Sequence, residues 1–118
     1  MGVDKTFEDF CVIMDNIVKK SPDAKILIQS TTPMTADSPI RTDKVNNEEI
    51  ERYNKMLLDL CKDKGWYYLD VAEVMKDANG ALKPEYCCDP EKMGIHLSTQ
   101  ANKIWAEYIK THVPEDLK

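Results

Sequence analysis

The run Lys25-Ile26-Leu27-Ile28-Gln29 decides the fold, because adjacent apolar residues in so short a segment predict a strand covered on both faces. Strands of that kind occur in parallel sheets flanked by helices. The segment 66–71 (WYYLDV) predicts a second strand. Between the two, Asn46 or Asn47 can cap a long helix that Gly65 ends. Strand, loop, helix and strand therefore form one right-handed βαβ unit.

Further helices are predicted on either side of this unit. Thr6-Phe7-Glu8-Asp9 has the form of a capping box, and apolar residues then recur at helical spacing until Ser21-Pro22. A short helix is expected over 72–77. Ser98 or Thr99 opens a last helix that fades before Pro114. The fold class is α/β, with about two strands and three to four helices in a single domain over residues 1–118.

The composition fits one globular domain but leaves its sheet incomplete. The chain has 118 residues, of which 42% are hydrophobic and 31% charged. A parallel sheet needs both faces covered and its edges paired, and two strands do not achieve that. Either another copy of the chain completes the sheet, or the chain is a piece of a larger α/β protein.

Charge and hydropathy exclude several classes of partner. Sixteen basic against 21 acidic residues give a net charge of −5, whereas nucleic-acid-binding domains concentrate positive charge. No run approaches the roughly 20 apolar residues of a membrane span, and the start lacks the apolar core of a secretory signal. We therefore expect no nucleic-acid partner and no membrane partner, and a cytoplasmic location.

The cysteines do not indicate a disulfide scaffold or a metal centre. Cys11 and Cys61 fall on apolar helix faces, where a free thiol behaves as a small hydrophobic residue. Adjacent residues of an extended segment point to opposite sides, which suits neither a disulfide nor a chelating pair at 87–88. No CxxC or HxxxH spacing supports a zinc site, so neither metal nor cofactor is expected. The residues that could have formed such a zinc site are Cys87, Cys88, Asp89, His96 and His112.

The segment from Asp89 to Ser98 (DPEKMGIHLS) carries the chemistry. His96 stands between a glycine-containing loop and a helix start, where side chains are commonly exposed in a cleft. Asp89 lies upstream in the same loop. A carboxylate against one ring nitrogen of a histidine fixes its tautomer and leaves the other nitrogen to take a proton from a serine. The pair is the general-base half of a Ser-His-Asp triad.

Gly94-Ile95-His96-Leu97-Ser98 resembles the last conserved block of the SGNH (GDSL) hydrolases, a family of serine esterases, lipases and acylhydrolases. The segment 22–33 is similar to the family's penultimate strand region, and Tyr53-Asn54, 68–71 and Trp105 are also typical. The resemblance implies a flavodoxin-like three-layer αβα sandwich with a parallel sheet of about five strands. This chain would supply the C-terminal half, and the substrate would be a small-molecule ester.

The acid departs from the family pattern in its position. The family's aspartate usually stands three residues before the histidine, where this chain has Met93. Asp89 stands seven residues before His96 and can serve if the segment 90–93 loops out, which Pro90 and Gly94 favour. In the competing interpretations Asp89 caps a turn, or a backbone carbonyl orients His96 and leaves a Ser-His dyad.

The family's nucleophile motif, Gly-Asp-Ser, and its oxyanion-hole glycine and asparagine are absent from the sequence. Gly2-Val3-Asp4 is the nearest approach to the family's Gly-x-Asn-Asp block and lacks its asparagine. We therefore expect an inactive half-domain that carries acid and base, and that self-associates or pairs with a missing N-terminal half. The alternative is a non-catalytic scaffold or interaction module. A nucleotide binder is disfavoured, because no glycine-rich loop follows either strand.

The segment 30–46 is long for a loop without periodicity, and loops of this length are commonly functional. It leaves the carboxyl end of a strand, where α/β proteins place their ligands. We expect it to form a wall of the substrate pocket, with Thr31, Thr32 and Met34 as candidate contacts, although an ordinary connecting loop explains the same residues.

Overall fold

The computed structural model describes residues 2–117 and has α/β architecture, as the sequence predicts. Two strands, β1 (Leu27–Gln29) and β2 (Tyr67–Leu69), pair in parallel with Ile28 opposite Tyr68. The α-helices are α1 (Val3–Lys20), α2 (Asn47–Lys64) and α3 (Thr99–His112), and the 3₁₀ helices are η1 (Val71–Met75), η2 (Pro84–Tyr86) and η3 (Glu115–Leu117). The predicted βαβ unit is confirmed, with α2 as its crossover helix.

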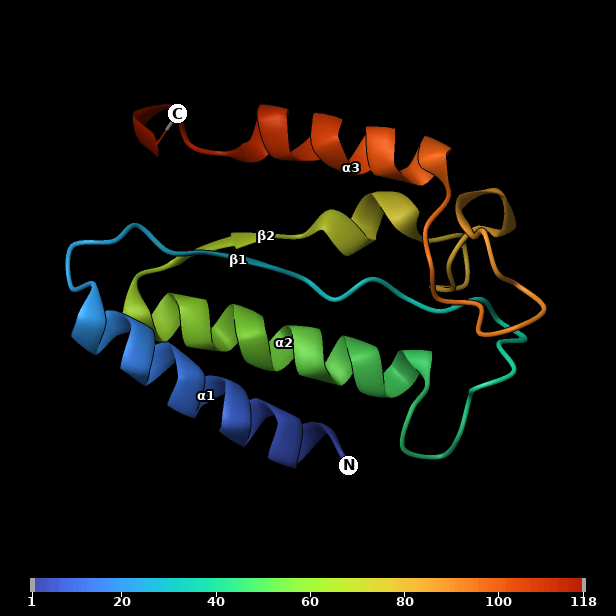
Figure 1. Ribbon diagram of the computed structural model, residues 1–118, viewed down its shortest axis with the longest axis horizontal. Helices are drawn as coiled ribbons and strands as arrows, with labels where there is room; N and C mark the ends of the chain where they lie inside the picture. Colours follow the sequence, from blue (N-terminus) through green and yellow to red (C-terminus); the bar gives the residue numbers. More distant parts are fainter. Residues whose placement is uncertain (1, 118) are drawn as a thin grey trace.

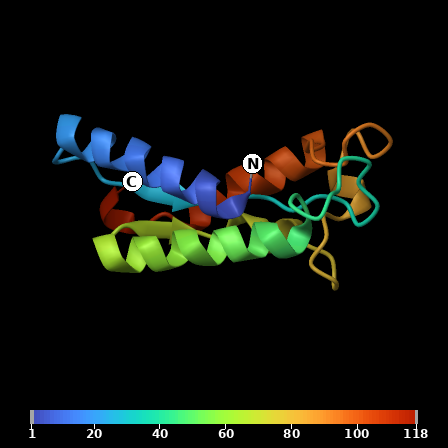
Figure 2. The ribbon, with the colours of Figure 1, turned by 90° about the horizontal axis from the view of Figure 1, so that it is seen from below.

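The helices form two layers around the strand pair. Helices α1 and α2 lie on one side of it and α3 on the other (Figure 1), and the view from below places α1 beside α2 with α3 behind them (Figure 2). A buried cluster fills each interface. The cluster under α1 and α2 contains Met14, Ile28, Leu57 and Cys61. The cluster under α3 contains Met75, Leu82, Tyr86, Cys87 and Ala101.

Three of the predicted helix caps are present. The Asn46 side chain accepts a hydrogen bond from the Glu49 N–H (2.9 Å) and begins α2. Ser98 accepts from the Ala101 N–H (3.2 Å) and begins α3. Gly65 ends α2 with φ at +74°, a conformation that suits glycine. The local signals at these ends therefore correspond to the observed boundaries.

The predicted start of the first helix is wrong. Helix α1 begins at Val3, and the Thr6 hydroxyl donates to the Gly2 carbonyl (3.0 Å) inside the first turn instead of capping it. Asp4 is favourable in the first turn of a helix, and Lys5 pairs with Asp9 one turn later (2.9 Å). The short helix predicted over 72–77 is the 3₁₀ helix η1.

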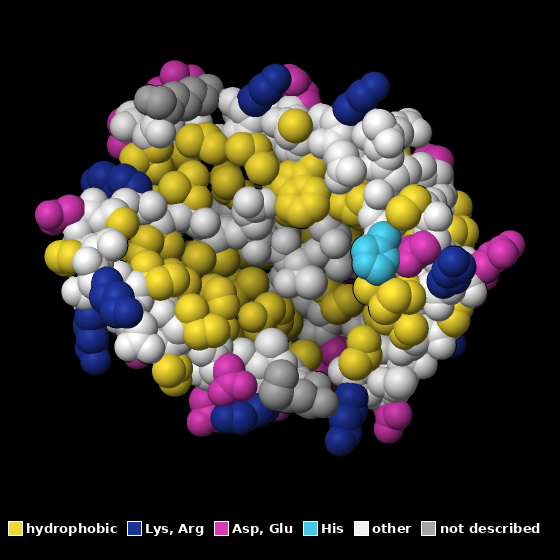
Figure 3. All heavy atoms as spheres, viewed as in Figure 1, with side chains coloured by type: hydrophobic (Ala, Val, Ile, Leu, Met, Phe, Trp, Pro, Cys, Tyr) yellow, Lys and Arg dark blue, Asp and Glu magenta, His cyan; other side chains and the backbone are white. Residues whose placement is uncertain are grey.

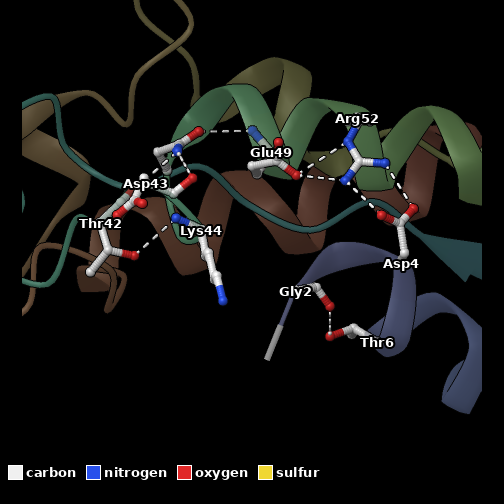
Figure 4. A network of polar contacts seen from close by, with 9 residues as sticks. Gly2, Asp4, Thr6, Thr42, Asp43, Lys44, Glu49 and Arg52 are labelled. Carbon is white, nitrogen blue, oxygen red and sulfur yellow. Dashed lines mark hydrogen bonds and ion pairs between the residues drawn. The ribbon is translucent and has the colours of Figure 1, made fainter.

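Figure 4 shows the exposed polar network that joins α1 to α2. The Arg52 guanidinium donates to Asp4 (3.0 Å) and to Glu49 (2.9 Å), and these bonds raise its pKa further above the ordinary value. Exposed pairs of this kind contribute about 0 to 1 kcal/mol. The contact between the two helices therefore depends mainly on their apolar cluster.

The strand pair has an open side. Backbone groups of alternate residues face opposite edges in a parallel strand. Because the Ser30 N–H donates to the Leu69 carbonyl, those of Leu27 and Gln29 face away from β2. Apolar side chains gather on both sides of a hollow that crosses this face of the molecule, between α3 and the α1–α2 pair (Figure 3). On α1, Ile13 is 58% exposed and Ile17 43%.

Candidate active site

The loop with Asp89 and His96 is closed at its base by backbone hydrogen bonds. Cys87 and Leu97 form an antiparallel bridge, and the Cys88 N–H donates to the His96 carbonyl (2.9 Å). At the next position the Ser98 N–H donates to the Tyr86 carbonyl (2.9 Å). The two ends of the segment 88–97 are therefore held side by side, directly before α3 begins.

The segment 90–93 loops out. The N–H groups of Lys92 (3.1 Å), Met93 (3.1 Å) and Gly94 (2.9 Å) all converge on the Asp89 carbonyl, which folds the intervening residues into a compact turn. Gly94 completes the turn with φ at +69°, in the left-handed region that favours glycine. This turn brings a carboxylate seven residues upstream of the histidine into contact with its ring.

The two side chains face each other directly. His96 Nδ1 lies 2.5 Å from Asp89 Oδ2. The other carboxylate oxygen, Oδ1, accepts from the N–H groups of His96 (3.0 Å) and Ile95 (3.2 Å) and from the Cys87 thiol (3.3 Å). The bond with the His96 side chain, supported by these donors, holds the pKa of Asp89 well below the usual aspartate range. Asp89 is therefore an ionised carboxylate at neutral pH.

Exposure differs between the two members of the pair. The Asp89 side chain is 15% exposed and the His96 side chain 59%. Since Nδ1 faces the carboxylate, Nε2 lies on the opposite edge of the ring and is not taken up by this contact. The arrangement can accept a proton at Nε2 while the ionised carboxylate stabilises the imidazolium that results.

Three of the four serines use their hydroxyl groups in hydrogen bonds within the fold. Ser21 ends α1, and Ser30 Oγ accepts from the Ala72 N–H (2.9 Å). The Ser38 hydroxyl donates to the Met93 carbonyl, and Ser98 caps α3. The structure therefore presents the acid and base without a serine hydroxyl bonded to His96 in the described part of the chain.

A family model for GDSL-like lipases and acylhydrolases matches residues 3–104. The chain belongs to this family. The resemblance read from the segment 94–98 is thereby confirmed. No curated protein matches the sequence.

Several solved structures share the fold, among them a GDSL-like lipase. A GDSL-like lipase from Bacteroides thetaiotaomicron has a TM-score of 0.72 at 24% identity, covering 94% of this chain and 52% of that one. The esterase domain of a zebrafish retrotransposon protein has a TM-score of 0.73 at 15% identity, covering 94% and 62%. A protein from Bacteroides fragilis has a TM-score of 0.77 at 22% identity, covering 100% and 54%. The chain spans about half the length of most such structures.

The loop between β1 and α2 of this GDSL family member is anchored by two asparagines of α2. The Asn54 side chain accepts from the Thr31 N–H (2.7 Å) and donates to the Thr31 carbonyl (2.9 Å). Asn47 forms the same pair of bonds with Met34 (2.8 and 2.9 Å). The interpretation of Met34 as an open pocket residue is wrong, because its side chain is 2% exposed. Thr31 lines a cavity of about 290 Å³ between the start of α1 and α2.

Sequence reasoning missed the structural role of these asparagines. The available signal was Asn54, a polar residue on the otherwise apolar stripe of α2, where only a paired polar group is tolerated. No comparable signal marked Ser38 or Thr35, which lie in a loop without periodicity.

The cysteines occupy the expected environments with one exception. Cys61 is 2% exposed, as expected of a core residue, whereas Cys11 is only partly buried. Cys87 is buried and its neighbour Cys88 exposed, so the adjacent thiols point to different surroundings. Within residues 2–117, no three His, Cys, Asp or Glu side chains form a group that could hold a metal ion. No helix over the same range is long and apolar enough to span a membrane.

Proposed function

We propose that this chain supplies the acid and the base of a GDSL-type serine ester hydrolase, with Asp89 as the acid and His96 as the base. The observation that carries the proposal is the contact between Asp89 Oδ2 and His96 Nδ1 (2.5 Å), made by a histidine side chain that is 59% exposed. A small-molecule ester is the substrate class.

In this mechanism His96 Nε2 takes the proton from a serine hydroxyl, whose oxygen attacks the ester carbonyl. As the tetrahedral intermediate collapses, the bond to the alcohol oxygen breaks, that oxygen takes the proton from His96, and an acyl-enzyme remains. His96 then deprotonates a water molecule that attacks the acyl carbonyl, and returns this proton to the serine oxygen as the acyl bond breaks, which releases the carboxylic acid and the free serine. Asp89 stays ionised throughout and stabilises the imidazolium.

We propose further that the nucleophile and the oxyanion-hole donors come from a second segment that docks on the open side of the strand pair. Three observations support this. The chain spans about half of the solved structures from Bacteroides that it resembles. No serine hydroxyl is bonded to His96 in the described residues, and backbone groups of β1 face away from β2 toward a hollow flanked by apolar side chains (Figure 3). A parallel strand added to β1 would pair those groups.

The first experiment separates the half-enzyme from the alternatives. The isolated chain is expected neither to hydrolyse p-nitrophenyl acetate nor to react with a fluorophosphonate. Mixed or co-expressed with the segment encoded upstream, if that segment contains Gly-Asp-Ser, it is expected to give both activities. Robust hydrolysis by the isolated chain that His96→Ala abolishes would refute the half-enzyme. An upstream sequence without such a motif would favour the non-catalytic module.

Variants of the assembled enzyme test each role. His96→Ala is expected to abolish turnover, while His112→Ala, at the far end of α3, is the matched control and should leave it unchanged. Asp89→Asn is expected to lower kcat by roughly 10² to 10⁴-fold, because an amide leaves the histidine in the wrong tautomer. The exposed Asp23→Asn, between α1 and β1, is its control. An unchanged rate in Asp89→Asn would remove Asp89 from the triad.

A further inference from the structure

The loop between β1 and α2 contacts the turn that holds Asp89 against His96. The Thr35 N–H donates to the Gly94 carbonyl (2.9 Å), and the Ser38 hydroxyl donates to the Met93 carbonyl. Both residues come from a segment more than 50 positions away in the sequence. These two hydrogen bonds hold the outer part of the turn from outside it.

The contact is tight and shielded from solvent. Thr35 is 4% exposed and Ser38 6%, whereas residues 90–93 are exposed. A Cβ atom on Gly94 would lie 3.1 Å from Ser38 Cβ and 3.2 Å from Ser38 Cα, closer than side chains normally pack. The backbones of the two loops therefore touch, and the position of one sets the position of the other.

The Ser38 hydroxyl is oriented for this role by its own surroundings. Its oxygen lies within reach of the Ile40 N–H (3.4 Å), and its backbone N–H and carbonyl bond to Thr35 (3.1 Å) and Arg41 (3.2 Å) in the same turn. A hydroxyl has one proton to donate. With its oxygen facing Ile40, that proton is directed to the Met93 carbonyl.

We infer that Ser38 is a positioning residue for the Asp89–His96 pair. By holding the Met93 carbonyl, it keeps the turn 90–94 in the shape that brings Asp89 Oδ2 to His96 Nδ1. Its effect on turnover rests on the proposed function, but its effect on the pair does not. Removing the hydroxyl releases the exposed part of the turn. Among the described residues, the carboxylate is then held only by its donors on Cys87, Ile95 and His96, and its orientation toward the ring is less fixed.

The test measures the ring tautomer of His96 in the 118-residue chain by ¹⁵N NMR in alkaline solution. The wild-type pair predicts a proton on Nδ1 and a free Nε2, because Nδ1 donates to Asp89. Ser38→Ala is expected to shift the His96 ring ¹⁵N signals toward a mixture of the two tautomers. Backbone amide signals outside the two loops should stay in place. His112 is the reference in the same spectrum, and Ser21→Ala, at the end of α1, is the matched control.

A wild-type tautomer in folded Ser38→Ala would overturn the inference. Should that variant unfold, Gly94→Ala is the second test, because its methyl group pushes the same loops apart and must produce the same tautomer change. In the assembled enzyme, Ser38→Ala is expected to lower kcat at least 10-fold while KM changes little. A change of tautomer with an unchanged kcat would instead contradict the catalytic role of the Asp89–His96 pair. The two measurements therefore distinguish failure of the positioning role from failure of the proposed function.

Discussion

Gly94→Ala tests the contact between the two loops by stability. Gly94 has φ at +69°, and placing alanine in this left-handed conformation costs about 1 to 2 kcal/mol. Its new methyl group would also meet Thr35 Oγ1 and the Cβ (3.1 Å) and Cα (3.2 Å) atoms of Ser38. Because Ser38 Cα belongs to the backbone, the clash is not relieved by a side-chain rotation, and overpacking of this kind costs about 1 to 3 kcal/mol. The expected loss of unfolding free energy is about 2 to 5 kcal/mol.

Gly65→Ala is the matched control. Gly65 has a similar φ of +74°, but no neighbouring atom lies within 4 Å of the position its Cβ would take. Its expected loss is the backbone cost alone, about 1 to 2 kcal/mol. Urea denaturation followed by circular dichroism gives both values, provided that the two variants keep the wild-type m value. Equal losses in the two variants would show that the loops do not touch at Gly94, and would refute the packing argument.

Three further predictions concern other parts of the chain. Asn54→Ala should lower the unfolding free energy by about 2 to 4 kcal/mol in urea, because it leaves both backbone groups of Thr31 without a side-chain partner. In thiol titration of the native chain, exposed Cys88 should react first and Cys61 only on unfolding, since burial both shields Cys61 and raises its pKa. Because the pKa of Asp89 is lowered on folding, its stabilising effect is complete above about pH 4 and lost as the pH falls toward its folded pKa. The urea-midpoint gap between wild type and Asp89→Asn should therefore shrink on acidification.

Local patterns were sufficient to predict the βαβ unit and the ends of two helices. The run at 25–29 is apolar and β-favouring over a length too short for a helix, so its state was not ambiguous. Asn46, Gly65 and Ser98 act on backbone groups within a few residues of themselves, and such signals do not depend on the tertiary fold. The start of α1 was predicted wrongly because the sequence allows two roles for Thr6. It can cap a helix, or, as observed, its hydroxyl can bond to a carbonyl of the preceding turn.

The sequence predicted contact between Asp89 and His96 only on the condition that residues 90–93 loop out. The structure meets this condition through three N–H groups that converge on one carbonyl. The assignment of Asp89 as the triad acid stays a prediction until the variants are assayed. The hydrogen bond from Ser38 to the Met93 carbonyl could not be predicted from the sequence, because it joins two irregular segments that no periodicity relates.

The open side of the strand pair and the acid–base turn are linked through β1. Directly after this strand, Ser30 bonds to the start of η1 and Thr31 to Asn54, and the chain then enters the loop that contacts Gly94. On β1 itself, the Gln29 side chain accepts a hydrogen bond from the Trp105 indole of α3 (2.7 Å). A second segment paired with the free edge of β1 would restrain this strand and, through the loop, the turn that orients His96. If the proposed function holds, docking of the segment that carries the nucleophile would therefore also restrain His96, the base that the nucleophile requires.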